Sequence, residues 1–163
     1  MSDQSASRTD FVQRAEALGL HGLVMHFDTV RDADWLPWLL EVEETERGRR
    51  SLERRIRNAK LGRFKPLADF QWSWPKSIDR PLLEGLFKLR FMDEQANVVL
   101  VGPNGVGKTM LAKNLAHAAL LSGHTVTFTT ASEMLNTLAA EDSASGLQRR
   151  LSRLCRPALL CVD

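Results

Sequence analysis

The chain has 163 residues, of which 44% are hydrophobic and 26% are charged, and its formal net charge at pH 7 is +2. These values are ordinary for a globular protein, and no apolar run approaches the roughly 20 residues of a membrane-spanning helix. The polar N-terminus, with Asp3 and Asp10, lacks the layout of a secretory signal, so we expect a cytoplasmic protein. Cys155 and Cys161 form no CxxC pair and predict buried reduced thiols rather than a disulfide or zinc site.

The first third of the chain is expected to be helical. Apolar residues recur at helical spacing over residues 9–30, and Gly19 predicts a break between two short helices. A longer helix follows, with Asp34 as its expected N-cap and Pro37 in the first turn, where the missing N–H costs little. Gly62 is expected to end this helix.

The charge of this longer helix changes sign along its length. Four glutamates over residues 41–46 precede nine basic residues that only Glu53 opposes: Arg47, Arg49, Arg50, Arg54, Arg55, Arg57, Lys60, Arg63 and Lys65. Pairs at i,i+4 spacing, Glu43 with Arg47 and Glu46 with Arg50, explain the start of the run as a solvated helix surface. The remaining positive charges favour contacts with the phosphate backbone of nucleic acid, which weaken steeply with salt.

An aromatic, proline-interrupted stretch over residues 64–75 predicts an extended connector. Its rings are expected to anchor it on a neighbouring surface, with base stacking as the alternative: Phe64, Phe70, Trp72 and Trp74. Asp79 is the expected N-cap of the next helix, and Pro81 lies just inside that helix.

The sequence GPNGVGKT at residues 102–109 lies between the apolar run Asn97–Val101 and a helical pattern that starts at Met110. In this context GxxxxGKT predicts a phosphate-binding loop, because its glycines let successive backbone N–H groups point at phosphate oxygens. Lys108 is expected to reach the β- and γ-phosphates, and the Thr109 hydroxyl to bind Mg²⁺. The predicted nucleotide-binding residues are Gly102, Pro103, Asn104, Gly105, Val106, Gly107, Lys108 and Thr109.

Strands and helices alternate in the rest of the chain. Two further strands are expected at Thr125–Thr129 and Ala158–Val162, separated by two helices, the first with a capping box of Thr130 and Glu133. This alternation implies a parallel sheet covered on both faces. Asp163 follows the last strand, where P-loop proteins place a carboxylate that orients the water shell of Mg²⁺, so we expect a metal role for it with Thr109.

These residues resemble the IstB-like transposition helper ATPases, which are close to the DnaC-type helicase loaders within the AAA+ class. The likeness covers nearly the whole chain, and its matching stretches are Leu67–Phe70, Ile78–Arg80 with the helix through Leu86, Asn97–Thr109 and Leu159–Asp163. It implies an α/β fold, a P-loop NTPase of AAA+-like type with a parallel sheet and helices on both faces, preceded by an all-α N-terminal module. The expected limits are 1–65 for the helical module, 66–78 for the connector and 79–163 for a partial P-loop domain ending at the Walker B Asp163.

The resemblance implies a function as well as a fold. A chain of this kind would bind ATP and Mg²⁺, contact duplex DNA through its basic segment and help a partner transposase to select a target. Homo-oligomers are expected of full-length relatives. Two alternatives stay open: a DnaC-like helicase loader, and a DNA-binding remnant without a working nucleotide site.

Family members continue past Asp163 with an acidic residue that promotes hydrolysis, a sensor strand and arginines that act across subunits. The chain therefore resembles a C-terminally truncated form, and we predict no catalytic residue in it. In the AAA+ strand order 5-1-4-3-2, strand 4 separates the strands expected at Asn97 and Ala158. Its absence predicts a gap in the middle of the sheet and, because exposed strand edges favour aggregation, low stability of the polypeptide alone.

Overall fold

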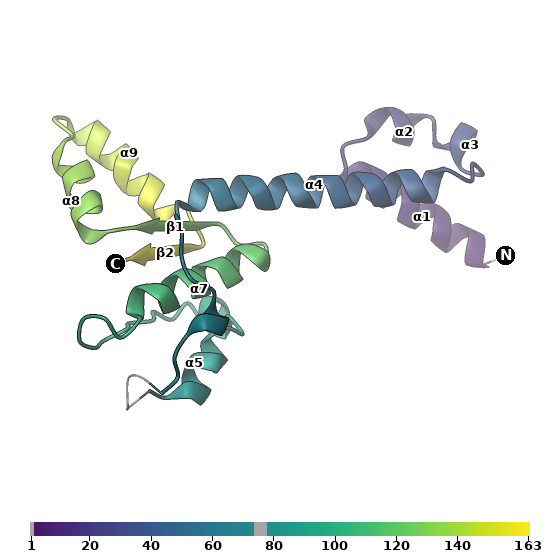
Figure 1. Ribbon diagram of the computed structural model, residues 1–163. Coiled ribbons are helices and arrows are strands. Elements are labelled where there is room, and N and C mark those ends of the chain that lie inside the picture. Colours follow the sequence, from purple (N-terminus) through teal and green to yellow (C-terminus); the bar gives the residue numbers. More distant parts are fainter. Residues whose placement is uncertain (1, 74–77) are drawn as a thin grey trace. The chain divides into compact units, whose positions relative to one another are not determined.

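A computed structural model describes residues 2–73 and 78–163 (Figure 1). Side chains are described from residue 9 onward within these ranges. The chain divides into two units, Met1–Ser51 and Leu52–Asp163, and each is described separately below. Within the described ranges, none of the helices combines the length and the apolar character that crossing a membrane requires.

Helices make up the first unit. In chain order these are α1 (Ser2–Ala17), α2 (His21–Met25), α3 (Phe27–Val30) and the first part of α4 (Leu36–Ala59). The break predicted at Gly19 is confirmed, with φ at +62°, and a further break at His26 divides the expected second helix into α2 and α3. The core of this unit consists of Ala15, Leu18, Phe27, Leu36 and Leu40.

The long helix α4 differs from its predicted limits at the start. It begins at Leu36, whose N–H donates to the Ala33 carbonyl at 3.0 Å, so a turn precedes the helix and Asp34 is not its N-cap. After the last helical residue, Ala59, positive φ values at Lys60 (+56°) and Gly62 (+62°) turn the chain. Gly62 therefore lies just beyond the helix end, as predicted.

The boundary between the units lies inside α4, between Ser51 and Leu52, whereas the sequence placed it at residue 65. The reason is apolar burial. Ala59 and Leu61 are buried in the core of the second unit, and the partly buried Phe64 packs against that core. The last part of α4 thus belongs to the same unit as the phosphate loop.

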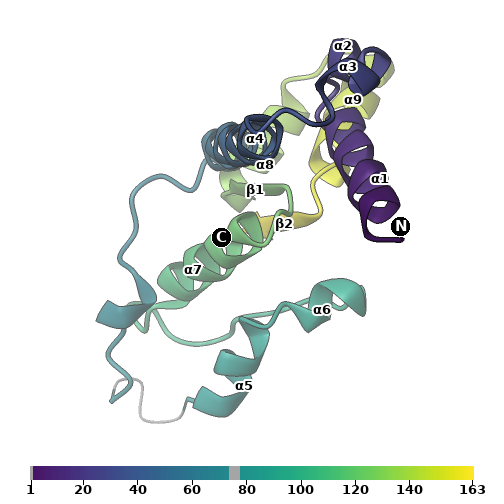
Figure 2. The same ribbon diagram turned by 90° about the vertical axis from the view of Figure 1, so that its right-hand side faces the viewer.

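In the second unit, the rest of α4 precedes η1 (Leu67–Asp69), α5 (Arg80–Leu86), α6 (Arg90–Asp93), α7 (Lys108–Leu121), β1 (Val126–Thr129), α8 (Ala131–Ala139), α9 (Ala144–Cys155) and β2 (Leu159–Val162). The strands β1 and β2 pair in parallel, from Val126 opposite Leu159 to Thr129 opposite Val162. In both views α7 runs along one side of the two strands, and α8 and α9 lie on the other (Figures 1 and 2). The predicted parallel α/β arrangement is confirmed for this part.

Two of the predicted helix starts are confirmed by their capping contacts. The Asp79 side chain accepts a hydrogen bond from the Leu82 N–H at 2.9 Å, with Pro81 in the first turn of α5. Thr130 and Glu133 form the capping box of α8, in which each side chain accepts from the other residue's backbone N–H. These local contacts define where the two helices begin.

The strand expected at residues 97–101 is absent from the described part of the chain. A strand needs a neighbour to take up its backbone hydrogen bonds, and the sheet consists of β1 and β2 alone. Val99 and Val101 are accordingly 78% and 90% exposed. An apolar groove of about 450 Å³, lined by residues 96–100 and by β2, lies where the gap in the sheet was predicted. The α/β fold is therefore incomplete at this position.

Candidate nucleotide-binding site

The phosphate loop has a backbone that requires glycine at two positions. Gly105 and Gly107 have φ values of +82° and +93°, a region that other residues adopt only with strain. A Cβ atom on Gly107 would also lie 2.7 Å from Cε2 of Phe70. The loop leads into α7, which begins at Lys108 rather than at Met110, so its first N–H groups lie beside the loop. Unpaired N–H groups at a helix N-terminus favour an anion.

Lys108 folds back over this loop. Its ammonium donates to the carbonyl oxygens of Gly102 at 2.9 Å and Pro103 at 2.8 Å. These acceptors are neutral, and a phosphate oxygen forms a stronger, charge-assisted hydrogen bond with the same donor. The side chain is thus already held over the space that a phosphate group would enter.

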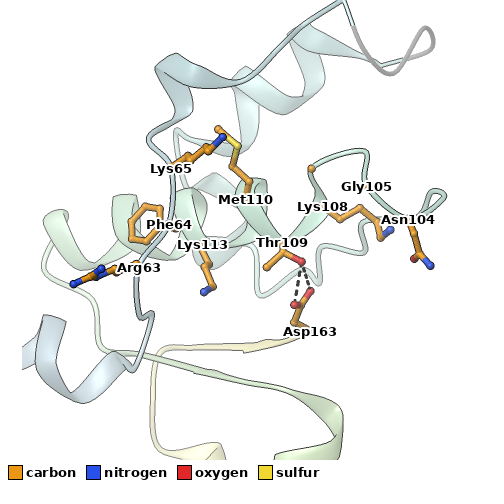
Figure 3. A pocket seen from close by; sticks show the side chains of 11 residues that line it. Arg63, Phe64, Lys65, Asn104, Gly105, Lys108, Thr109, Met110, Lys113 and Asp163 are labelled. Carbon is orange, nitrogen blue, oxygen red and sulfur yellow. Dashed lines mark hydrogen bonds between the residues drawn. The ribbon is translucent and has the colours of Figure 1, made fainter.

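Thr109 and Asp163 meet although 54 residues separate them in sequence. The Thr109 hydroxyl lies 2.9 and 3.0 Å from the two carboxylate oxygens of Asp163 (Figure 3). The backbone of Asp163 is held by its N–H on the Thr129 carbonyl and by its carbonyl oxygen on the Ala131 N–H, both at 3.0 Å. A hydroxyl and a carboxylate side by side supply the oxygen ligands that Mg²⁺ prefers, so this pair fits the expected metal.

The aromatic connector is anchored on the helices around the loop. Phe70 is buried with Leu83 of α5 and Leu111 of α7, and its ring meets Trp72 edge-on at 5.0 Å. The Arg80 guanidinium lies 4.6 Å from the centre of the Trp72 ring. The anchoring interpretation is therefore confirmed for these rings, while Trp74 and Pro75 lie outside the described residues.

Asn114 is a structural residue that the sequence analysis missed. It is 8% exposed, and its amide donates to the carbonyl oxygens of Lys65 at 2.9 Å and Met110 at 2.8 Å. These bonds fasten the connector to α7 one turn after the phosphate loop. Its signal in the sequence was an amide on an otherwise apolar helix face, beside Leu111 and Leu115.

A pocket of about 610 Å³ adjoins the loop (Figure 3). Among the predicted site residues it is lined by Asn104, Gly105, Gly107, Lys108, Thr109 and Asp163, together with Arg63, which the sequence assigned to DNA. Four further residues that were not predicted as nucleotide contacts also line it: Phe64, Lys65, Met110 and Lys113. The structure thus brings the phosphate loop, the pair of Thr109 and Asp163, and part of the basic segment to one pocket.

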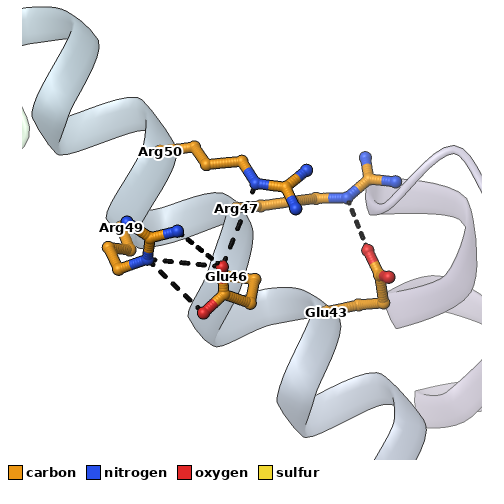
Figure 4. A network of polar contacts seen from close by, with 5 residues as sticks. All are labelled: Glu43, Glu46, Arg47, Arg49 and Arg50. Carbon is orange, nitrogen blue, oxygen red and sulfur yellow. Dashed lines mark hydrogen bonds and ion pairs between the residues drawn. The ribbon is translucent and has the colours of Figure 1, made fainter.

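The arginines at the start of the basic segment are engaged with glutamates of α4 (Figure 4). Arg47 pairs with Glu43 at 3.3 Å, as the sequence predicted. Glu46 contacts Arg49 at 2.9 Å and Arg50 at 3.9 Å, so its closer partner is the i,i+3 residue. The hydrogen bond from Arg49 lowers the pKa of Glu46.

The later basic residues differ in their surroundings. Arg54, Arg57 and Lys60 are exposed and form no ion pair with the described residues. Arg55 instead is half-buried and donates to the Leu120 carbonyl at 3.4 Å, near the C-terminal end of α7, where carbonyl groups carry partial negative charge. Arg54, Arg57 and Lys60 are consequently better placed than Arg55 to meet a polyanion.

Both cysteines are free, as predicted, but Cys155 is exposed rather than buried. Cys155 is the last residue of α9, where the helix gives way to the turn before β2. Cys161 is partly buried in β2, and burial raises its pKa to about 11. Among residues with described side chains, no group of three or more His, Cys, Asp or Glu is arranged to hold a metal ion.

Comparison with known proteins decides the family. A family model described as IstB-like ATP binding protein matches residues 14–163. The chain belongs to this family. The resemblance inferred from the sequence and the P-loop fold class are therefore confirmed.

Relatives of this IstB-like chain are named as ATP-binding proteins of insertion sequences. One, from insertion sequence IS21 of Pseudomonas aeruginosa, is 34% identical over 130 residues, which cover 80% of this chain and 49% of the relative. Another, from IS5376 of Geobacillus stearothermophilus, is 31% identical over 131 residues, covering 80% and 52%. The protein y4uH of Sinorhizobium fredii is 32% identical over 157 residues, covering 91% and 63%. The chain thus spans about half the length of the first two relatives.

Proposed function

We propose that this chain binds ATP with Mg²⁺ at Gly102–Thr109 and acts in the cytoplasm as a DNA-associated helper of transposition, working with a partner transposase. The contact that carries the nucleotide part of the proposal is Thr109 with Asp163, because it joins the end of the phosphate loop to the carboxylate after β2. The names of the relatives favour a transposition helper over a helicase loader, since each is an ATP-binding protein of an insertion sequence.

The proposed residue roles follow from the chemistry of each group. The N–H groups of the loop and of the start of α7 bind the phosphates, and Lys108 exchanges its two carbonyl acceptors for phosphate oxygens. Thr109 and Asp163 hold Mg²⁺ and its water shell. When bound, Mg²⁺ would neutralise phosphate charge, while the chain's own residues fix where the phosphates lie.

DNA association rests on a separate observation, the exposed and unpaired Arg54, Arg57 and Lys60 at the end of α4. These residues precede the turn that leads to the pocket. The residues that would contact duplex DNA are therefore close in sequence to Arg63 and Lys65, which line the pocket. ATP binding would then favour a form of the protein that assembles on DNA, in the way that nucleotides switch other P-loop proteins.

The nucleotide proposal is tested by equilibrium binding of a fluorescent ATP analogue to the full chain, with and without Mg²⁺. Lys108→Ala removes a charge-assisted contact and should raise Kd by about 10- to 100-fold. Asp163→Asn should remove most of the strengthening that Mg²⁺ gives. Lys88→Ala, at an exposed lysine away from the pocket, is the matched control and should bind like the parent. No binding by the parent chain would favour the DNA-binding remnant instead.

The DNA proposal is tested by measuring duplex binding at several salt concentrations. Replacing both Arg54 and Arg57 with Ala should reduce the slope of log K against log salt by about 2, since each lost phosphate contact removes about 0.9. A control with Lys88 and Arg90 replaced removes the same charge from exposed positions outside α4. Equal slopes for the two double variants would rule out the end of α4 as the contact.

A further inference from the structure

Lys113 is a positively charged residue of the pocket lining to which the proposed function assigns no role. It lies on α7 one turn after Thr109, and it is only partly exposed. Because residues four apart lie on the same face of a helix, Lys113 shares a face of α7 with Thr109, and both residues line the pocket. Its ammonium and the Asp163 carboxylate extend to the same side of α7, whereas the Arg63 guanidinium extends away from the phosphate loop (Figure 3).

No carboxylate within the described ranges pairs with Lys113. It contacts an aromatic ring instead, with the ammonium 5.0 Å from the centre of the Phe128 ring. A ring face stabilises the charge without using the N–H donors, which stay free for an anion. An anionic partner stabilises a partly buried ammonium more than an exposed one, because burial has already removed some of the water that would otherwise solvate the charge.

The charges that line the pocket are unbalanced. Lys108 and Lys113 belong to α7, Arg63 and Lys65 lie between α4 and η1, and Asp163 is the one carboxylate in the described lining. That carboxylate is hydrogen-bonded to Thr109 and faces the place where Mg²⁺ is expected. Excess positive charge remains for phosphate groups beyond those held by the loop.

We infer that Lys113 is a specificity-determining residue that makes this pocket prefer ATP over ADP. This inference rests on the proposed nucleotide function. The loop N–H groups serve phosphates that both nucleotides carry, so they contribute little to the distinction. Lys113 adds positive potential beside Thr109 and Asp163, on the metal side of the pocket, where the γ-phosphate supplies negative charge that ADP lacks. The preference for ATP therefore depends on the charge of Lys113.

The experiment measures Kd for the Mg²⁺ complexes of fluorescent ATP and ADP analogues with the full chain. In Lys113→Met, which keeps the length and apolar packing of the side chain, the ATP Kd should rise about tenfold and the ADP Kd about twofold. The ratio of the two constants then falls about fivefold. Lys113→Arg should restore the ratio, because it returns the charge, and Lys88→Met is the matched control at an exposed lysine.

The outcomes separate this inference from the proposal on which it rests. If the parent binds neither nucleotide, the nucleotide function is refuted, and the inference with it. If the parent binds both, Lys108→Ala weakens both, and Lys113→Met leaves the ratio unchanged, then the inference alone is refuted. A structural role for Lys113 would weaken ATP and ADP equally and would not respond to Arg. Lys113→Gln, a second neutral variant, should lower the ratio as Lys113→Met does. Far-UV circular dichroism of each variant checks that the change in ratio occurs in a folded protein.

Discussion

The contact between Gly107 and Phe70 gives a sharp prediction about the phosphate loop. Gly107→Ala introduces a Cβ at φ +93°, and that atom would lie 2.7 Å from Cε2 and 3.4 Å from Cδ2 of Phe70. The ring cannot easily move away, because Phe70 is buried against Leu83 and Leu111. Gly105→Ala is the natural comparison, since Gly105 has a similar φ of +82° but nothing within 4 Å of its Cβ position.

The two substitutions should differ by the steric term alone. Placing Ala in the left-handed region costs about 1–2 kcal/mol at either position. Crowding against a packed ring adds about 1–3 kcal/mol at Gly107 only. Gly107→Ala should therefore destabilise the loop by about 2–5 kcal/mol in total. Gly105→Ala should cost about 1–2 kcal/mol.

Hydrogen exchange is the suitable assay, because it reports local opening even where unfolding of the whole chain is not two-state. The Leu111 N–H, which donates to the Gly107 carbonyl at 2.9 Å, is the reporter for the first turn of α7. Its exchange should quicken more in Gly107→Ala than in Gly105→Ala, by roughly 5- to 150-fold. In a Phe70→Ala background that extra factor should disappear, since the double-mutant cycle removes the crowding partner.

Two results would refute this reasoning. The first is equal acceleration of exchange by Gly105→Ala and Gly107→Ala, which would mean that the ring yields at no cost. The second is a Gly107→Ala effect that is unchanged in the Phe70→Ala background. Either result would show that Phe70 packs near the loop without restricting which residues fit at position 107.

Two further predictions concern the cysteines and the free edge of β2. Burial raises the pKa of Cys161 to about 11, so below that pH its thiol stays protonated, and at pH 8 alkylation should modify the exposed Cys155 first. The Cys161 thiolate population should be lower than that of an ordinary thiol by about 100-fold, and mass spectrometry of the timed reaction with iodoacetamide checks this order. Leu160→Lys places a charge on the exposed side of β2, next to the groove, and should raise the soluble fraction of the expressed chain. Comparable precipitation of parent and variant in a centrifugation assay would show that this edge does not drive aggregation.

Much of the site could be predicted from sequence because its signals are local. The spacing of glycines, Lys108 and Thr109 specifies the loop by itself, and the cap at Asp79 depends on residues only three positions apart. Prediction failed where a distant partner decides the structure. Residues 97–101 have the composition of a strand, but pairing requires a neighbour that the sheet does not provide. The roles of Asn114 and Lys113 depend on the connector and Phe128, which no spacing within α7 reveals.

The pocket is supported unequally on its two sides, and this bears on what a nucleotide would do. The side formed by Thr109 and Asp163 is fixed by the ladder of β1 and β2, which extends to Asp163 through its bond to the Thr129 carbonyl. The other side begins at Gly102, directly after residues 97–101, and these residues form no hydrogen bonds with a neighbouring strand. A ligand that bridges Lys108 and the pair of Thr109 and Asp163 would join these two sides and stabilise the folded form, by an amount that grows with the logarithm of its concentration over Kd. Nucleotide binding and folding of the second unit should therefore be linked, so that the stabilisation given by a fixed ATP concentration, measured against each variant's own free chain, is smaller for Lys108→Ala than for the parent.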